Sequence, residues 1–195
     1  GPLRGGGPGA FKQRLVLAAT MSPSYGIYGG YELMENEPYS EESEEYLNSE
    51  KYEIRNRNWE DPSSLGSYIA RINAMRQKHP CLRWLKNIRF QGSSNDHVIA
   101  YSKHTHNGTG SPQGTTGETG KSEPDVLLIV INLSTTEPSE TTLTLDLPAL
   151  GLPAGGPFDA HEELTNTTFV WQGPNPYVWL DRDEPAQIFH LRRRS

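Results

Sequence analysis

The chain has 195 residues, and its 24 acidic and 18 basic side chains give a formal net charge of −6 at pH 7. The acidic excess lies after residue 101 and neither half is basic, which argues against partners such as nucleic acid or an anionic membrane. Nineteen glycines, fifteen prolines and a hydrophobic content of only 34% favour a loop-rich domain with many turns over a helical bundle.

Cysteine usage and the N-terminus indicate a soluble, cytoplasmic protein. The single cysteine, Cys81, cannot form an internal disulfide, and the glycine-rich start lacks the apolar stretch of a secretory signal. The longest apolar run, residues 126–131, is too short to span a bilayer. Because the chain opens on GPLRGGGPGAFKQR without an initiator methionine, we expect a fragment of a longer protein.

The first predicted element is a helix over residues 10–20, with Phe11, Leu15 and Ala18 on one stripe. Pro23 ends it, because proline has no backbone N–H to donate. Residues 25–31 (YGIYGGY) follow, and their aromatic and β-branched content predicts a strand. Their glycines favour close approach of neighbouring strands on both sides, as in a buried parallel sheet.

A polar, glutamate-rich segment at residues 32–62 comes next, and loops of this length in a compact domain are usually functional or disordered. Residues 65–79 predict a second helix whose apolar face carries Leu65, Ile69 and Ile72, with Met75 or Arg76 completing it. Ser63 or Ser64 is placed to cap this helix, and Pro80 terminates it.

From residue 84 the hydrophobic period changes to that of β-structure. Short strands with turn residues between them predict an antiparallel sandwich or barrel. A Gly/Thr/Ser-rich insertion at residues 103–124 is predicted to be a flexible hairpin loop. The predicted strands are residues 85–90, 97–102, 125–132, 141–147, 157–164, 168–171, 177–180 and 186–191.

The fold class follows from joining these parts. One parallel-type strand with two helices has no sheet to join, so its partner strands must lie outside this chain. We therefore predict that residues 1–81 form the end of an α/β barrel of the TIM type, with its last strand and helices. Residues 82–195 are predicted to form an all-β sandwich domain. In such barrels the loops after the strands build the active site, which places residues 32–62 on the catalytic rim.

Several other sequence patterns are weaker indications of function. Residues 115–122 (TTGETGKS) have threonine where a phosphate-binding loop requires glycine, and they lead into a strand rather than a helix. His104 and His106 lack further ligands at metal-binding spacing, which favours a solvated pair. Glu162 and Glu163, adjacent on a strand, are expected to be surface charges on opposite faces. We predict no metal and no cofactor.

Three segments resemble a known family. The order helix, SYGIYGGYE, long loop, helix, all-β domain resembles the C-terminal end of α-amylase-clan glycoside hydrolases. More narrowly, FKQRLVLAATMSPSYGIYGGYEL, EEYLNSEKYEIRNRNW and EELTNTTFVW resemble the bacterial α-1,4-glucan:maltose-1-phosphate maltosyltransferases. The loop segment is the most specific of the three, because generic amylases lack it.

The resemblance implies transfer of maltosyl units from α-maltose 1-phosphate to the non-reducing end of α-1,4-glucans, with retention of configuration. It places Lys51 and Tyr52 at the donor maltose, where lysine donates hydrogen bonds and tyrosine offers a flat face and a hydroxyl. The nucleophile and the general acid that a retaining mechanism needs lie upstream in this family, so no catalytic residue is expected in this chain. The resemblance also suggests a homodimer.

Two other functions remain open. A non-catalytic β-sandwich that binds glucan or a protein is the first, and it predicts that Trp84, Trp171, Trp179 and Tyr177 gather on an exposed face. A fragment of an amylase-type hydrolase is the second, and the SEKYE motif at residues 49–53 disfavours it.

Overall fold

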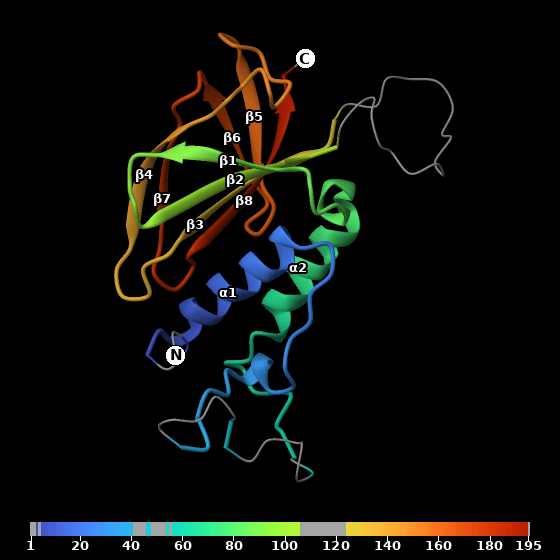
Figure 1. The fold of residues 1–195 in the computed structure, drawn as a ribbon, viewed down its shortest axis with the longest axis vertical. Helices are drawn as coiled ribbons and strands as arrows, with labels where there is room; N and C mark the ends of the chain where they lie inside the picture. The colour runs from blue at the N-terminus through green and yellow to red at the C-terminus, as the bar shows by residue number, and fades with distance from the viewer. Residues whose placement is uncertain are drawn as a thin grey trace, which may run out of the picture.

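A computed structural model describes residue 3 and residues 5–40, 46–47, 54, 56–105 and 124–194 (Figure 1). Two α-helices precede eight strands in this part of the chain. The helical elements are α1 (Gly7–Met21), η2 (Tyr31–Leu33), α2 (Gly66–Lys78) and η3 (Pro80–Arg83). The strands are β1 (Ile88–Ser93), β2 (Val98–His104), β3 (Val126–Asn132), β4 (Ser139–Thr144), β5 (Pro157–Glu162), β6 (Thr167–Gln172), β7 (Tyr177–Leu180) and β8 (Ala186–Arg193).

The eight strands form one curled antiparallel sheet in the order β6-β5-β8-β3-β2-β1-β4-β7. The sheet turns a corner between β1 and β4, where only Gly92 and Ser93 of β1 pair with the neighbouring strand. A Cβ at Gly92 would lie 2.9 Å from the Cβ of Thr144, so the corner requires glycine. The all-β prediction for the second part of the chain is confirmed, with every predicted strand overlapping an observed one.

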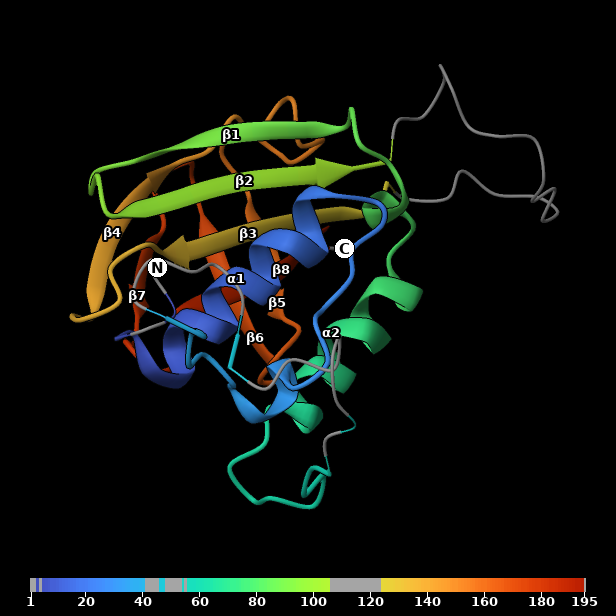
Figure 2. The ribbon, with the colours of Figure 1, turned by 60° about the horizontal axis from the view of Figure 1, so that its bottom comes forward.

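Two hydrophobic cores lie on opposite faces of the sheet. Inside the curl, residues of β4 and β7 such as Leu143 and Val178 pack against Phe158 of β5 and Phe189 of β8, as the two layers of a sandwich do. On the outer face, α1 and α2 cover β2, β3 and β8 (Figure 2). The strand β3 is buried along its whole length because it has a core on each side.

Helix α1 starts three residues before the predicted boundary and is longer by one residue at its end. Its buried stripe includes Phe11 and Leu15 as predicted, whereas Ala18 is exposed. Two buried polar side chains attach the helix to the sheet: the Gln13 amide donates to the Asn132 carbonyl at 2.7 Å, and Thr20 shares a 2.6 Å hydrogen bond with the Tyr101 hydroxyl. These contacts satisfy polar groups that burial would otherwise penalise.

Helix α2 matches its prediction closely, and Leu65, Ile69, Ile72 and Met75 all lie in the core. The residue preceding the helix is Leu65 rather than a serine, but the Ser64 hydroxyl accepts a 3.1 Å hydrogen bond from the first helical N–H. Arg76 points toward the end of α1, where its guanidinium donates to the carbonyls of Ala19, Ser22 (3.1 Å) and Pro23 (2.7 Å). It thereby satisfies the carbonyls that a helix end leaves open.

The predicted strand at residues 25–31 is absent. Residues 25–28 pair with none of the described strands, and the chain then turns at Gly30 into the short helix η2. A strand exists only through hydrogen bonds to a neighbouring strand, and the described part of this chain supplies no parallel neighbour. The boundary predicted after residue 81 falls inside η3, and residues 106–123 of the predicted insertion lie outside the described residues.

Candidate functional site: the rim segment and the histidine cluster

The two ends of the rim segment, residues 32–62, lie close together beside the N-terminal end of α2. Glu32 accepts a 2.7 Å hydrogen bond at its carbonyl from the N–H of Leu65, so the start of the loop is tied to the start of α2. Gly30 just before it has φ +97°, and a Cβ there would lie 2.2 Å from the carboxylate of Glu35. Glycine is therefore required where the chain reverses into the loop.

An ion pair holds the base of the segment. The Arg57 guanidinium donates to both carboxylate oxygens of Glu35, at 3.0 and 3.2 Å, and to the Gly29 carbonyl at 3.3 Å. The Arg57 side chain is only 2% exposed and Glu35 is 15% exposed, so water screens this pair weakly. Arg57 also lies 5.7 Å from the ring of Trp59, a cation–π distance.

Tyr31 connects the same region to the first helix. Its hydroxyl donates a 2.6 Å hydrogen bond to the Phe11 carbonyl, and the two rings meet edge to face with centroids 5.0 Å apart. Burial raises the pKa of Tyr31 to about 12, which favours the protonated hydroxyl that donates this hydrogen bond. The base of the segment is thus built from residues far apart in sequence.

Lys51 and Tyr52, the predicted donor-binding residues, lie outside the described residues, as does the acidic run 41–45. The described residues of the rim segment include a base held by hydrogen bonds and an ion pair, and two exposed aromatic rings: Tyr39 is 71% exposed and Trp59 56%. Exposed rings beside a polar loop can stack on the faces of sugars. A retaining transfer needs two free carboxyl groups about 5 Å apart, whereas the Glu35 carboxylate is bound to Arg57.

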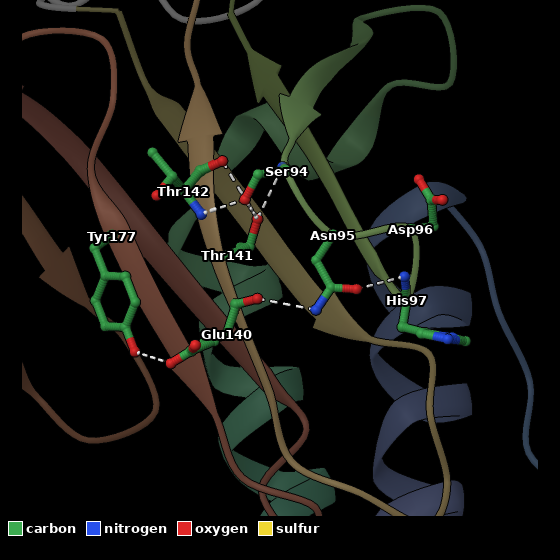
Figure 3. A pocket seen from close by; sticks show the side chains of 8 residues that line it. All are labelled: Ser94, Asn95, Asp96, His97, Glu140, Thr141, Thr142 and Tyr177. Carbon is green, nitrogen blue, oxygen red and sulfur yellow. Dashed lines mark hydrogen bonds between the residues drawn. The ribbon is translucent and has the colours of Figure 1, made fainter.

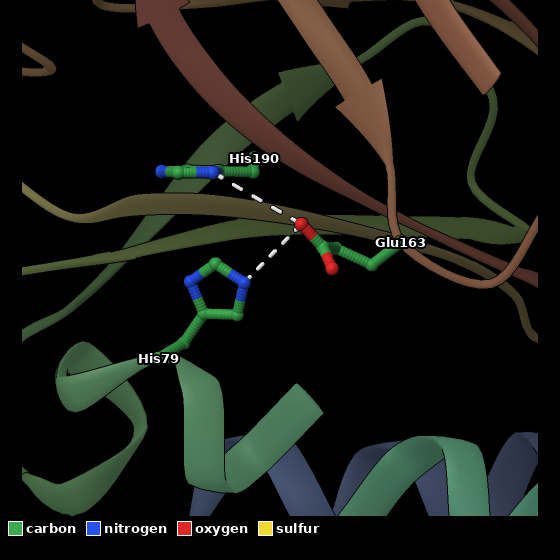
Figure 4. A group of neighbouring side chains, drawn as sticks. All are labelled: His79, Glu163 and His190. Carbon is green, nitrogen blue, oxygen red and sulfur yellow. Dashed lines mark ion pairs between the residues drawn. The ribbon is translucent and has the colours of Figure 1, made fainter. Parts of the chain in front are cut away.

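A second polar cluster, which the sequence does not reveal, lies between the end of α2 and the sheet (Figure 4). The Nδ1–H of His79 donates to Asp125 Oδ1, 2.7 Å away, and Nε2 of the same ring lies 3.2 Å from Glu163 Oε1. His190 lies between the same two carboxylates, at 3.6 and 4.0 Å. Lys78 reaches both oxygens of Glu163 at 2.7 and 2.8 Å.

The electrostatics of this cluster follow from its burial. Burial by itself would lower the pKa of His79, but its hydrogen bond to Asp125 and the nearby Glu163 carboxylate outweigh burial and raise that pKa. Burial would raise the pKa of Glu163, yet its bonds to His79 and Lys78 lower it to about 2. Burial and the neighbouring charge of His79 together lower the pKa of His190 to about 4. A cationic His79 between two carboxylates is the arrangement that these shifts describe.

His79, Glu163 and His190 are also the described residues whose ligand atoms come close enough together for a metal ion, within 4.8 Å of one another. The Lys78 ammonium already occupies both oxygens of Glu163, and a cation there would be repelled by it. We therefore interpret the group as an ion-pair network that fastens α2 to the sheet. The prediction that Glu162 and Glu163 are surface charges is wrong. Glu162 is buried and accepts hydrogen bonds from the N–H groups of Thr165 and Ile188, whereas Glu163 is half-buried with a side chain only 7% exposed.

Some of the remaining predicted features are confirmed, and others fall on residues that the structure does not describe. Cys81 is fully buried beside Leu82, as expected for a small apolar side chain. His104 lies half-buried at the end of β2, whereas His106 and residues 115–122 lie outside the described residues. Clustering of four aromatic residues on an exposed face would favour a glucan- or protein-binding module. Tyr177 and Trp179 share the exposed face of β7, Trp171 packs on the inner core, and Trp84 is 39% exposed just after η3. Neither described α-helix combines the length and apolar character that crossing a bilayer requires.

The arrangement of α1, α2 and a curled antiparallel sheet places the chain in a recognised fold class. It superposes on the α-amylase of Anoxybacillus with a TM-score of 0.60, covering 96% of this chain and 33% of that one at 18% identity. The α-amylase of Geobacillus thermoleovorans gives a TM-score of 0.58 over 96% and 34% of the two chains, also at 18% identity. The fold is thus that of the C-terminal region of α-amylases.

Sequence comparison identifies the family to which the chain belongs. The sequence model of the family described as "GLGE, C-terminal" matches residues 90–191, just over half of the chain, and the chain belongs to this family. Maltosyltransferase 2 of Streptomyces coelicolor, an alpha-1,4-glucan:maltose-1-phosphate maltosyltransferase, is 44% identical over 99% of this chain and 27% of its own length. The enzyme of that name from Corynebacterium glutamicum is 43% identical over 97% of this chain and 26% of its own.

These comparisons confirm the resemblance to maltosyltransferases drawn from the sequence motifs. The chain spans about a quarter of the length of the curated relatives it matches. It corresponds to their C-terminal portion, because the matching family model is that of the C-terminal domain.

Proposed function

We propose that this chain is the C-terminal part of a retaining maltosyltransferase that extends α-1,4-glucans with maltosyl units from α-maltose 1-phosphate. The supporting observation is the 44% identity to such an enzyme along 99% of this chain. In this proposal the rim segment carries Lys51 and Tyr52 to the donor maltose. Residues 1–81 complete an α/β barrel whose other strands belong to the rest of the protein, and that part supplies the nucleophile and the general acid.

The rigid base of the rim segment supports this role. A loop that recognises a sugar must present its side chains in a fixed place, because each misplaced contact loses binding energy. Here Gly30, the Glu35–Arg57 ion pair and the bond from Leu65 to Glu32 hold both ends of the loop at the N-terminal end of α2. We further propose that the whole protein acts in the cytoplasm and as a homodimer.

A chimera tests the proposal. The last quarter of the Streptomyces coelicolor relative is replaced by this chain, and phosphate release from α-maltose 1-phosphate is measured with maltohexaose as acceptor. We expect the chimera to lengthen maltohexaose by two glucose units at a time, and the 195-residue chain alone to show no transfer. Transfer by the chain alone would contradict the proposal.

Two outcomes with the chimera would also contradict it. The first is a chimera that elutes and melts as a folded protein but releases no phosphate. The second is release of free maltose instead of a longer glucan, which would favour an amylase-type hydrolase. The unmodified relative is the matched control for folding and for rate.

A further inference from the structure

A polar cleft opens on the β domain, away from the rim segment, between the β1–β2 turn and strands β4 and β7 (Figure 3). Its volume is about 470 Å³, large enough for part of an oligosaccharide. None of the described residues that line it is a lysine or arginine, so it is unsuited to phosphates or other anions. The lining residues are Ser94, Asn95, Asp96, His97, Glu140, Thr141, Thr142 and Tyr177.

The floor of the cleft is held in place by hydrogen bonds between the turn and β4. The Ser94 hydroxyl accepts a 2.9 Å hydrogen bond from the N–H of Thr142, and the Ser94 N–H donates to the Thr141 hydroxyl at 3.1 Å. The Asn95 amide donates to the Glu140 carbonyl at 2.9 Å. A floor with this many internal bonds needs little reordering when a ligand binds, which lowers the entropic cost of binding.

Polar groups that could meet a ligand remain around this floor. Within the described part of the chain, neither the Asp96 carboxylate nor the His97 imidazole has a hydrogen-bond or ion-pair partner. One carboxylate oxygen of Glu140 accepts a 2.6 Å hydrogen bond from the Tyr177 hydroxyl, and the other has no partner among the described residues. Carboxylates accept two hydrogen bonds from neighbouring hydroxyls, and imidazole both donates and accepts.

Two aromatic rings extend the same surface. Tyr177 and Trp179 lie on one face of β7, and the register places them directly beside Thr142 and Glu140 of β4. Their side chains are 58% and 50% exposed, whereas the residues between and after them on β7 are buried. Residues two apart on a strand are about 7 Å apart, so the rings form a short platform beside the polar cleft.

We propose that this surface, defined by Asp96, His97, Glu140, Tyr177 and Trp179, binds an α-1,4-glucan chain. A glucose ring presents C–H groups on its face and hydroxyls around its edge, and the surface offers aromatic faces beside unpaired polar groups. The inference rests on the proposed function, because it identifies the ligand as the glucan on which that enzyme acts. The site would hold the polymer away from the donor site and raise its local concentration.

Binding is tested on the 195-residue chain itself, by native electrophoresis through gels containing glycogen and by titration calorimetry with maltoheptaose. We expect retardation by glycogen, and we expect Trp179→Ala and Tyr177→Ala each to weaken binding about fivefold to tenfold, the effect of losing about 1 kcal/mol of stacking. Asp96→Asn is expected to weaken it without altering the melting temperature. Trp84→Ala is the matched control, since Trp84 is 39% exposed and does not line the cleft.

The proposal is overturned if glycogen does not retard the chain, or if Trp84→Ala weakens binding as much as Trp179→Ala. Equal affinity for cellohexaose, which has β-1,4 linkages, would also overturn it. A chain dimer that Trp179→Ala dissociates would identify a second copy as the occupant instead. The outcome is separable from the transferase test: a chimera that transfers maltosyl units while the chain ignores glycogen refutes only the present inference.

Discussion

Nδ1 of His79 and Oδ1 of Asp125 lie 2.7 Å apart, and this contact joins the C-terminal end of α2 to the first residue before β3. Asp125 accepts a second hydrogen bond, from the N–H of Cys81 at 3.0 Å. One carboxylate therefore fixes both the end of the helix and the turn that follows it. Because the pair is largely buried, removing one partner leaves the other without its ion-pair partner and without full hydration.

We expect Asp125→Ala to lower the free energy of unfolding by about 3 kcal/mol, the usual effect of removing one partner of a buried ion pair. Urea denaturation monitored by circular dichroism measures this change. Asp183→Ala is the control, since Asp183 forms an exposed pair with Arg182 and should cost less than about 1 kcal/mol. Equal effects of the two substitutions would show that the His79–Asp125 contact does not stabilise the fold.

The same cluster predicts a dependence of stability on pH. The pKa of His79 is raised by folding, so its contribution is complete below its unfolded pKa, about 6.5, and is lost as pH rises through the folded value. The pKa of Glu163 is lowered to about 2, so its contribution is present above pH 4.5 and is lost as pH falls toward 2. The pKa of His190 is lowered to about 4, so this residue destabilises the folded state as pH falls from 6.5 to 4, and its effect is opposite in sign to that of His79.

Comparison with His79→Gln isolates the contribution of His79. The stability difference between the two proteins should be largest near pH 5 and should shrink as pH rises above 6.5. In the variant the pKa of His190 should rise from about 4, because the neighbouring cation is gone, and NMR titration of the imidazole signals measures this. A stability difference that grows above pH 7 would contradict a cationic His79.

Gly9→Ala is expected to lower the free energy of unfolding, although helix propensity alone would predict an increase. Alanine usually stabilises a helix by up to about 1 kcal/mol relative to glycine. A Cβ at Gly9, however, would lie 2.2 Å from the backbone carbonyl oxygen of Arg182, so α1 must move away from the β7–β8 turn. We expect a loss of about 2 kcal/mol in urea denaturation. Gly5→Ala, with no atom within 4 Å of its Cβ, should change stability little, and a stabilised Gly9→Ala protein would refute the close packing.

Gly30→Ala is expected to loosen the base of the rim segment. The substitution places a side chain at φ +97° and drives a Cβ into the Glu35 carboxylate, which together should cost about 2 kcal/mol and break the bond to Arg57. Trypsin should then cut the rim segment faster than in the wild-type chain. Gly26→Ala is the control because its Cβ meets no atom within 4 Å, and unchanged cleavage in Gly30→Ala would argue against a rigid base.

Lys51→Ala tests the proposed donor contact in the active chimera. Loss of a charged hydrogen bond to the donor should raise KM for α-maltose 1-phosphate by about tenfold or more. The melting temperature should stay the same, because removing one polar surface-type side chain takes no apolar group out of either core cluster. Lys86→Ala, a lysine outside the rim segment, should leave KM unchanged. An unaltered KM in Lys51→Ala would remove this residue from the donor site.

The order and type of the main elements follow from local sequence pattern. Short alternating or continuous apolar runs along the second half predict the eight strands, and the spacing of Leu65, Ile69, Ile72 and Met75 identifies the buried face of α2. Such patterns are readable because side chains on one face of a helix or strand recur at a fixed interval. The family was readable for the same reason, since its motifs are contiguous in sequence.

What depends on distant residues was decided only by tertiary structure. His79, Asp125, Glu163 and His190 come from four separate places along the chain, and nothing local indicates that the two acids are half-buried beside histidines. The cleft beside Tyr177 likewise exists only because the β1–β2 turn folds over β4. Residues 25–31 show the converse: their composition favours a strand, but strand formation requires hydrogen-bonding neighbours that no local pattern can supply.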